Sequence, residues 1–210
     1  MKHIYFVRHG STPGNESKLY KVETEPLSEN GIKQAEFVAK RFQTIPIDTI
    51  VSSEMTRAAQ TAEVIAKELG KEIIYTKLFQ EIMRPSIVRN RSQKDPDVEA
   101  IMKAIADNAH DAAWRHSDEE NFHDLRDRAT QCIEYLKTVV GENILVVTHG
   151  YMLRMIAAVM LFGNDLTVPM FKRLNHFLVT KNTGITYMTE DSGVFRVQTW
   201  NDHAHLGEIK

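Results

Sequence analysis

Short apolar runs alternate with amphipathic stretches along most of the chain. The strand-like runs are rich in β-branched and aromatic side chains and cover residues 3–7, 47–53, 72–76 and 143–150. After the second run, apolar residues recur with helical spacing from Ala58 to Leu69, and Gly70 stands where a C-terminal helix cap belongs. Because strands and helices alternate, the pattern predicts a three-layer α/β/α fold with a mostly parallel central sheet.

Two further elements extend this pattern at either end of the chain. Ser28 is a suitable N-cap for a helix that places Ile32, Ala35, Ala39 and Phe42 on one face. Near the C-terminus, strands are expected at 183–189 and 194–200, joined by a tight turn at Asp191-Ser192-Gly193.

The segment from about 82 to 140 departs from the alternation. It contains two consecutive amphipathic helices with no strand between them, one around Val98 to Ile105 and one around Phe122 to Leu136. We expect this segment to be a helical cap insertion over the carboxyl edge of the sheet. Since no linker or repeat interrupts the chain, residues 1–210 are expected to form a single domain.

The composition gives no indication of binding to nucleic acid or to an anionic membrane. Hydrophobic residues make up 42% of the chain, charged residues 26%, and the net charge is −2, so no global field attracts nucleic acid or an anionic membrane. The single cysteine, Cys132, excludes an internal disulfide and is expected to be a buried, inert thiol. Without a signal-like or membrane-spanning run, a cytoplasmic location is expected, and the oligomeric state stays open.

Two strand-like runs end in the same dipeptide, His-Gly, in "YFVRHG" and "LVVTHG". Ligands of open α/β sheets bind outside the carboxyl ends of the strands, so His9 and His149 are expected at one edge and close together. Gly10 and Gly150 would let the backbone approach a ligand there. The helix expected after Gly150 would direct unpaired N–H groups at an anion.

Two arginines join this edge. Arg8 precedes the first histidine, and Arg57 lies in the first turn of the helix after the second strand. Fixed positive charge repels a metal cation, whereas guanidinium groups match phosphate oxygens, so a phosphate site without a metal is expected. The alternative is that each arginine merely pairs with a surface carboxylate.

Motifs throughout the chain are similar to those of one family. They are Arg8-His9-Gly10 followed by Thr12 and Asn15, "PLSENGIKQA" at 26–35, "SSEMTRAAQTA" at 52–62, "VVTHG" ending at Gly150, and "NDHAHL" at 201–206. In this order they resemble the histidine phosphatase superfamily, the phosphoglycerate mutase-like proteins, and favour its phosphatase branch.

The resemblance implies a role for each site residue. His9 would attack phosphorus to form a phosphohistidine, and Glu81, shortly after the third strand, would be the general acid and base. The phosphate-binding residues would be Arg8, Asn15, Arg57, a protonated His149 and the Gly150 backbone, with Thr12 beside them. Nearby positive charge would lower the pKa of His9 and so favour its neutral, nucleophilic form. No cofactor is implied.

Two segments depart from the family's pattern. Residues 83–86 (MRPS) replace a Gly…Glu-Gly segment, and residues 19–22 (LYKV) replace a Gln-Gly. Both would border the non-phosphate half of the substrate, a small phosphorylated metabolite or a phosphorylated residue. Arg84, Arg89 and Arg91 are either contacts for a second anionic group or a solvated loop. The expected activity is phosphomonoester hydrolysis, the alternatives being a phosphoglycerate mutase-type phosphomutase or a non-catalytic binding module.

Overall fold

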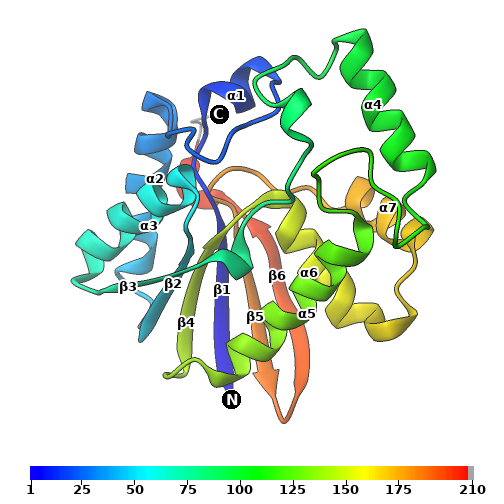
Figure 1. Cartoon of the computed structure of the whole chain (residues 1–210). Coiled ribbons are helices and arrows are strands. Elements are labelled where there is room, and N and C mark those ends of the chain that lie inside the picture. Colours follow the sequence, from blue (N-terminus) through cyan, green and yellow to red (C-terminus); the bar gives the residue numbers. More distant parts are fainter. Residues whose placement is uncertain (208–210) are drawn as a thin grey trace.

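A six-stranded sheet forms the centre of the computed structural model, which describes residues 1–207 (Figure 1). Its strand order is β3-β2-β4-β1-β5-β6. Strands β1 to β4 are parallel, whereas β5 runs antiparallel to β1 and β6 antiparallel to β5. The predicted mostly parallel sheet is therefore confirmed. The bounds are β1 Lys2–Arg8, β2 Thr49–Ser53, β3 Ile73–Thr76, β4 Asn143–Thr148, β5 Ile185–Asp191 and β6 Val194–Asp202.

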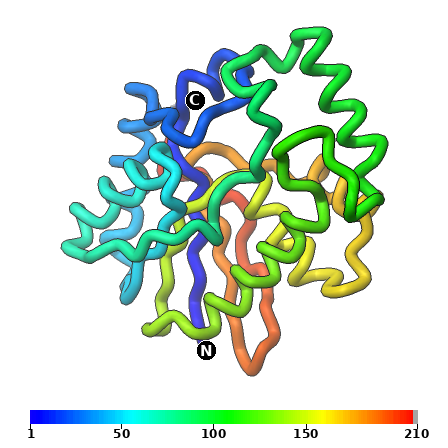
Figure 2. Tube along the Cα trace, in the orientation of Figure 1, coloured from blue at the N-terminus to red at the C-terminus, as the bar shows by residue number. Residues whose placement is uncertain are grey.

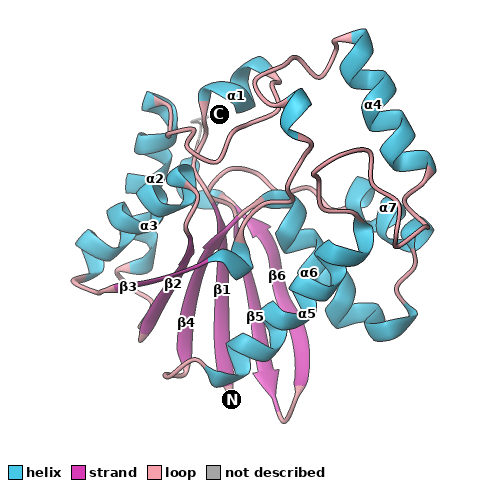
Figure 3. Cartoon of the chain, viewed as in Figure 1, coloured by secondary structure: helices cyan, strands magenta, loops and turns pink. Residues whose placement is uncertain are grey.

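Helices cover both faces of this sheet (Figure 3). Helices α2 and α3 pack over one face, and α5 and α6 over the other. The helix bounds are α1 Pro13–Ser17, α2 Glu29–Phe42, α3 Thr56–Leu69, α4 Pro96–Asp107, α5 Phe122–Thr138, α6 Gly150–Phe162 and α7 Val168–Phe177. Within residues 1–207, no helix combines the length and the apolar character that a membrane crossing requires.

The sheet places the two His-Gly dipeptides side by side. Strands β1 and β4 are neighbours in parallel register, and Arg8 pairs with Thr148 at their last position. Their inward side chains, including Ile4, Phe6 and Val146, are fully buried. A one-residue slip would turn these side chains to the opposite faces of the sheet, so burial holds the register. The next residue of each strand is a histidine.

The helical insertion divides into two parts. Helix α4 lies beyond the carboxyl edge of the sheet, away from the sheet layers (Figure 2). Helix α5 instead packs on the sheet face, because Leu125, Cys132 and Leu136 are buried in the same apolar cluster as β1 and β4. Burial raises the pKa of the Cys132 thiol to about 12, in line with an inert cysteine. Only the earlier part of the segment from about 82 to 140 therefore lies over the carboxyl edge.

The structure contains the predicted caps at the start of α2 and the end of α3. It differs from the prediction in the buried face of α2 and in two additional helices. Ser28 caps α2 by accepting the Gly31 N–H, and Gly70 ends α3 in the left-handed conformation with φ of 63°. Ile32 was expected on the buried face of α2 but is 46% exposed; Gln34 and Val38 are buried instead. Helices α1 and α7 were not predicted. The first has only five residues, too few for an apolar period. The second is amphipathic, with Phe171 buried and Met170 and Leu174 packed against the same core, so the sequence did carry a signal for it.

We expect Gly31→Ala to destabilise the fold, although alanine is the better helix former. A Cβ at this position would lie 2.0 Å from the backbone oxygen of Ser11, where neither atom can move freely. Overpacking of this kind costs about 1–3 kcal/mol, which exceeds the helix-propensity gain of about 1 kcal/mol. Urea denaturation of the variant measures the loss, with the exposed Glu36→Ala on the same helix as control. An increase in stability would contradict the close packing of α2 on residues 10–11.

Candidate active site

Two buried imidazoles meet at the carboxyl edge of the sheet. The ring centroids of His9 and His149 are 5.0 Å apart, with a tilt of 54° between the planes. Both residues are at most 1% exposed. The expected convergence of the two strand ends is thus present in the structure.

A backbone contact orients the first ring. The Nδ1 atom of His9 lies 2.7 Å from the backbone oxygen of Gly10. Because a carbonyl oxygen can only accept, Nδ1 carries the proton, and the lone pair of a neutral His9 is on Nε2. The Asn182 side chain donates to the His9 carbonyl at 2.8 Å and holds the backbone at this point. The ring nitrogen free to attack an electrophile is therefore Nε2.

The second ring has one engaged and one free nitrogen. The Nε2 atom of His149 lies 2.9 Å from Ser53 Oγ, whereas its Nδ1 is buried without a hydrogen-bond partner among the described residues. An unpartnered buried nitrogen is costly unless a ligand satisfies it. Burial, followed by the charges of Arg57, Lys21 and Arg8, lowers the pKa of His149 well below its usual value. This direction favours a neutral ring in the free protein, whereas the protonated His149 expected from the sequence belongs to a site that binds phosphate.

The two expected arginines, Arg8 and Arg57, lie close enough to His9 for their charges to lower its pKa. The Arg8 Nη1 atom donates to the Thr180 backbone oxygen at 2.6 Å, and Arg57 Nη1 donates to the Val22 oxygen at 3.0 Å. Neither guanidinium has an ion pair with a carboxylate among the described residues, and the Nε of each is buried without a partner. Burial lowers the pKa of both, for Arg8 to about 10. Concentrated positive charge without a counterion is what an anion site requires.

Glu81 is a carboxylate whose charge acts on both arginines and opposes the lowering of their pKa by burial. Its Oε1 accepts the Met152 N–H at 3.1 Å and its Oε2 the Tyr151 N–H at 3.3 Å, so it sits at the N-terminus of α6. It is half-buried and lines the same pocket as Arg57. A surface carboxylate with no link to the site would not be held in this way.

The remaining predicted residues, Thr12, Asn15, Gly10 and Gly150, contact other protein atoms around the site. Thr12 and Asn15 form a capping box on α1, in which Asn15 Oδ1 accepts from the Thr12 backbone N–H and hydroxyl. Gly10 and Gly150 were expected to let the backbone approach a ligand without a clashing Cβ, but the space that a Cβ would occupy faces protein atoms at both positions. A Cβ on Gly10 would lie 2.5 Å from the Gly31 oxygen, and one on Gly150 would lie 2.8 Å from Thr180 Oγ1.

Two cations that the sequence reasoning missed complete the charge cluster. Lys21, from the loop that replaces the family's Gln-Gly, and Arg154, one turn into α6 from Gly150, both line a pocket of about 180 Å³ with Arg57 and Glu81. Burial, with the charges of Arg8 and Arg57, lowers the pKa of Lys21 to about 8. The spacing of Arg154 from Gly150, four residues on one helix face, was a signal that could have identified it. Lys21 had no such signal.

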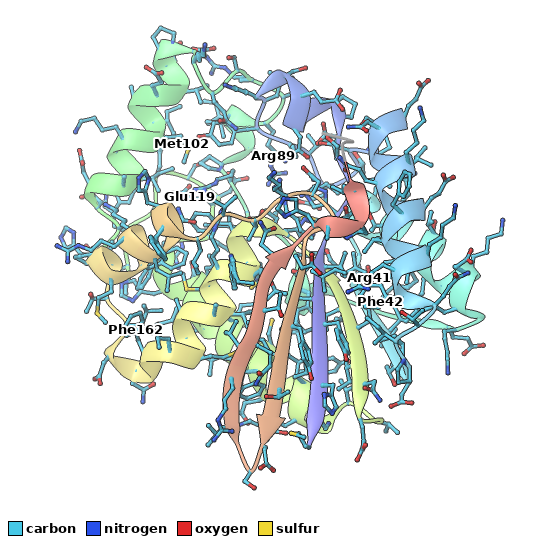
Figure 4. The ribbon with its side chains drawn as sticks, turned by 180° about the vertical axis from the view of Figure 1, so that it is seen from behind. Arg41, Phe42, Arg89, Met102, Glu119 and Phe162 are labelled. Carbon is cyan, nitrogen blue, oxygen red and sulfur yellow. The ribbon has the colours of Figure 1, made fainter. Side chains whose placement is uncertain are left out.

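The three arginines of the loop after β3 separate into two groups. Arg84 and Arg89 line the pocket, and Figure 4 shows Arg89 above the carboxyl edge of the sheet. Arg91 instead pairs with Asp95 at 2.7 Å and does not line the pocket.

Known proteins share both the sequence pattern and the fold. The sequence model of the histidine phosphatase superfamily (branch 1) matches residues 4–203. A curated relative, the probable phosphoglycerate mutase GpmB of Photorhabdus laumondii, is 31% identical over 172 residues, 80% of this chain and 77% of that protein. Two solved structures cover 98% of this chain and are themselves covered in full: Bacillus stearothermophilus YhfR, with a TM-score of 0.81 and 25% identity, and an Entamoeba histolytica phosphoserine phosphatase, with a TM-score of 0.79 and 24% identity.

We expect both site histidines to be neutral at pH 6 in the free protein. Burial and the surrounding cations lower the pKa of each well below the usual 6.5, so protonation requires a more acidic solution. Imidazole ¹⁵N chemical shifts, assigned with His9→Ala and His149→Ala, report the charge directly. Imidazolium shifts for either ring at pH 6 would contradict the electrostatics described above.

Proposed function

The chain belongs to the histidine phosphatase superfamily, and on that premise we propose that it hydrolyses a phosphomonoester through a phosphohistidine on His9. The observation that carries this proposal is the pair of imidazoles 5.0 Å apart, with His9 Nε2 left free by the Nδ1 contact to Gly10. Arg8, Arg57, Lys21 and Arg154 supply the positive charge that a phosphoryl group requires.

In the first step, the Nε2 lone pair of His9 attacks phosphorus. A P–N bond forms as the bond from phosphorus to the alcohol oxygen breaks, and the electron pair leaves on that oxygen. The guanidinium groups of Arg8 and Arg57 bind the phosphoryl oxygens together with Gly150 and Asn15. An incoming phosphate dianion favours protonation of His149, whose free Nδ1 can then donate to it.

Glu81 transfers a proton in both steps, first as the general acid and then as the general base. As the P–O bond breaks, the Glu81 carboxyl gives its proton to the departing oxygen and releases a neutral alcohol. Its carboxylate then takes a proton from water as that water attacks phosphorus, and cleavage of the P–N bond releases inorganic phosphate and restores His9. The N–H groups of Tyr151 and Met152 keep the carboxyl next to the phosphoryl group throughout.

A small phosphorylated metabolite is the substrate class that the neighbours support. One relative is a phosphoserine phosphatase crystallised with 3-phosphoglyceric acid. The name of the curated relatives favours a second candidate, phosphoryl transfer back to another hydroxyl of the same substrate. Hydrolysis is preferred here because exposed side chains, Glu23 and Gln93, line the pocket and leave it open to water, which a mutase must exclude.

We expect His9→Ala to lower kcat for p-nitrophenyl phosphate by about a thousandfold or more, because it removes the nucleophile. Phosphate release in the presence of EDTA measures the rate, and rapid acid-free quenching with ³²P-labelled substrate measures the phosphoenzyme. Hydrolysis that is equally fast in His9→Ala would contradict the proposal. A long-lived phosphoenzyme that transfers its phosphate to glycerate, with little release to water, would favour the mutase instead.

Lys21 adds a titratable charge to phosphate binding in this proposal. Its pKa of about 8 has burial as its main cause, opposed by the nearby carboxylates of Glu81 and Glu25. Below that pH the ammonium attracts the phosphate dianion, and above it the neutral amine does not.

We expect Lys21→Met to lower kcat/KM about tenfold to hundredfold at pH 7, the effect of losing a charged hydrogen bond of about 1.5–3 kcal/mol. In the wild type kcat/KM should decline above pH 8, as the Lys21 ammonium loses its proton, and this decline should disappear in Lys21→Met. Lys21→Arg should retain activity and move the decline to higher pH. The control is the exposed Lys67→Met on α3. An unchanged pH profile in Lys21→Met would show that this amine does not contact the substrate.

A further inference from the structure

The pocket lined by Lys21, Arg57, Glu81 and Arg154 is called the phosphate pocket below. A second cavity lies next to it, beneath α4. It has a volume of about 220 Å³, and most of its lining is apolar. Met102 and Glu119, both labelled in Figure 4, are among the residues that line it. The apolar side chains that line it come from four helices and include Met102, Ile105, Phe122, Tyr151, Met155 and Phe171.

Helix α4 leaves its apolar face unfilled over this cavity. Val98 is the one fully buried side chain of α4, whereas Met102 and Ile105 are half-buried. On the opposite side, the Tyr151 and Phe171 rings meet edge to face at 5.2 Å. A cavity of roughly 150 Å³ with such a lining is large enough for benzene, so this one can take an aromatic ring or a short alkyl chain.

The cavity adjoins the pocket of Arg57 and Glu81, because the two have walls in common. Ile82, Arg84 and Tyr151 line both pockets. Tyr151 connects them most directly, because its backbone N–H donates to Glu81 while its ring faces the apolar cavity. The oxygen that Glu81 protonates belongs to the leaving alcohol, so the body of that alcohol lies beside the Tyr151 ring.

We propose that the cavity beneath α4 binds the apolar body of the leaving alcohol, so that the preferred substrates are phosphomonoesters of alcohols with an aromatic or alkyl group. This inference rests on the proposed phosphatase function and adds the chemical class of the leaving group. The Arg84 guanidinium, 5.0 Å from the centre of the Tyr151 ring, forms the wall over which the apolar group passes.

Alkyl phosphates of increasing chain length test the proposal. In the wild type, kcat/KM should rise about threefold to fourfold for each added methylene until the cavity is full, because each buried methylene contributes about 0.8 kcal/mol. If the wild type hydrolyses no phosphomonoester, the proposed function fails. If it hydrolyses short and long esters at equal kcat/KM, the function stands and the apolar subsite fails.

Variants of the cavity wall separate a subsite from a general structural effect. Ile105→Trp fills the space, and Ile105→Asn keeps the space but removes its apolar lining. Both should flatten the chain-length series, whereas Ala100→Trp, an exposed position of α4 away from the cavity, should leave it unchanged. Equal losses for every ester in the Ile105 variants would overturn the proposal.

A binding measurement gives a readout without turnover. Trp114 lines the cavity, and the only other tryptophan is Trp200. In Trp200→Phe, octylphosphonate should shift the Trp114 emission, and methylphosphonate should not. Equal responses to both phosphonates, or none to either at concentrations that inhibit hydrolysis, would show that the apolar group does not enter the cavity.

Discussion

The parallel register between β1 and β4 is the constraint on which the site depends. Pairing of Arg8 with Thr148 places the next residue of each strand, His9 and His149, at neighbouring positions of one sheet edge. That register is held by buried apolar side chains along both strands, up to Val7 in β1 and Val147 in β4. The geometry of the imidazoles is thus a consequence of core packing, and a rigid sheet supplies the positional accuracy that phosphoryl transfer requires.

The electrostatic state of the site follows from burial of like charges. Arg8, Arg57 and Lys21 surround two imidazoles, and burial reinforces their mutual repulsion. In the free protein this arrangement is unfavourable, and the fold compensates through carbonyl contacts to the arginines at Thr180 and Val22. A phosphate dianion removes the imbalance. In the proposed mechanism, neutral histidines in the free protein and a protonated His149 in the phosphate complex are two states of one charge cluster.

The residues around His9 and the cavity proposed to select the substrate lie largely on different elements. The groups around His9 come from β1, α3, β4 and α6, which are anchored in the two cores. Helix α4 is anchored mainly through Val98 and borders a partly filled apolar space. Tyr151 belongs to both regions, since its backbone contacts Glu81 and its side chain lines both the phosphate pocket and the cavity. If the cavity is the proposed subsite, changes in α4 alter the choice of leaving group without disturbing the reacting atoms.

The sequence by itself determined which runs are strands and where α2 begins and α3 ends. It also determined that one edge of the sheet brings together His9, His149, Arg8 and Arg57. These follow from local rules, because alternation, capping residues and strand ends are visible in short windows. Tertiary structure decided what depends on distant contacts. The side of Gly10 that would carry a Cβ packs against Gly31, and α5 joins the sheet face. Lys21 reaches the phosphate pocket from a loop that carries no periodic signal. Such placements depend on which surfaces meet after folding, and no local pattern encodes that.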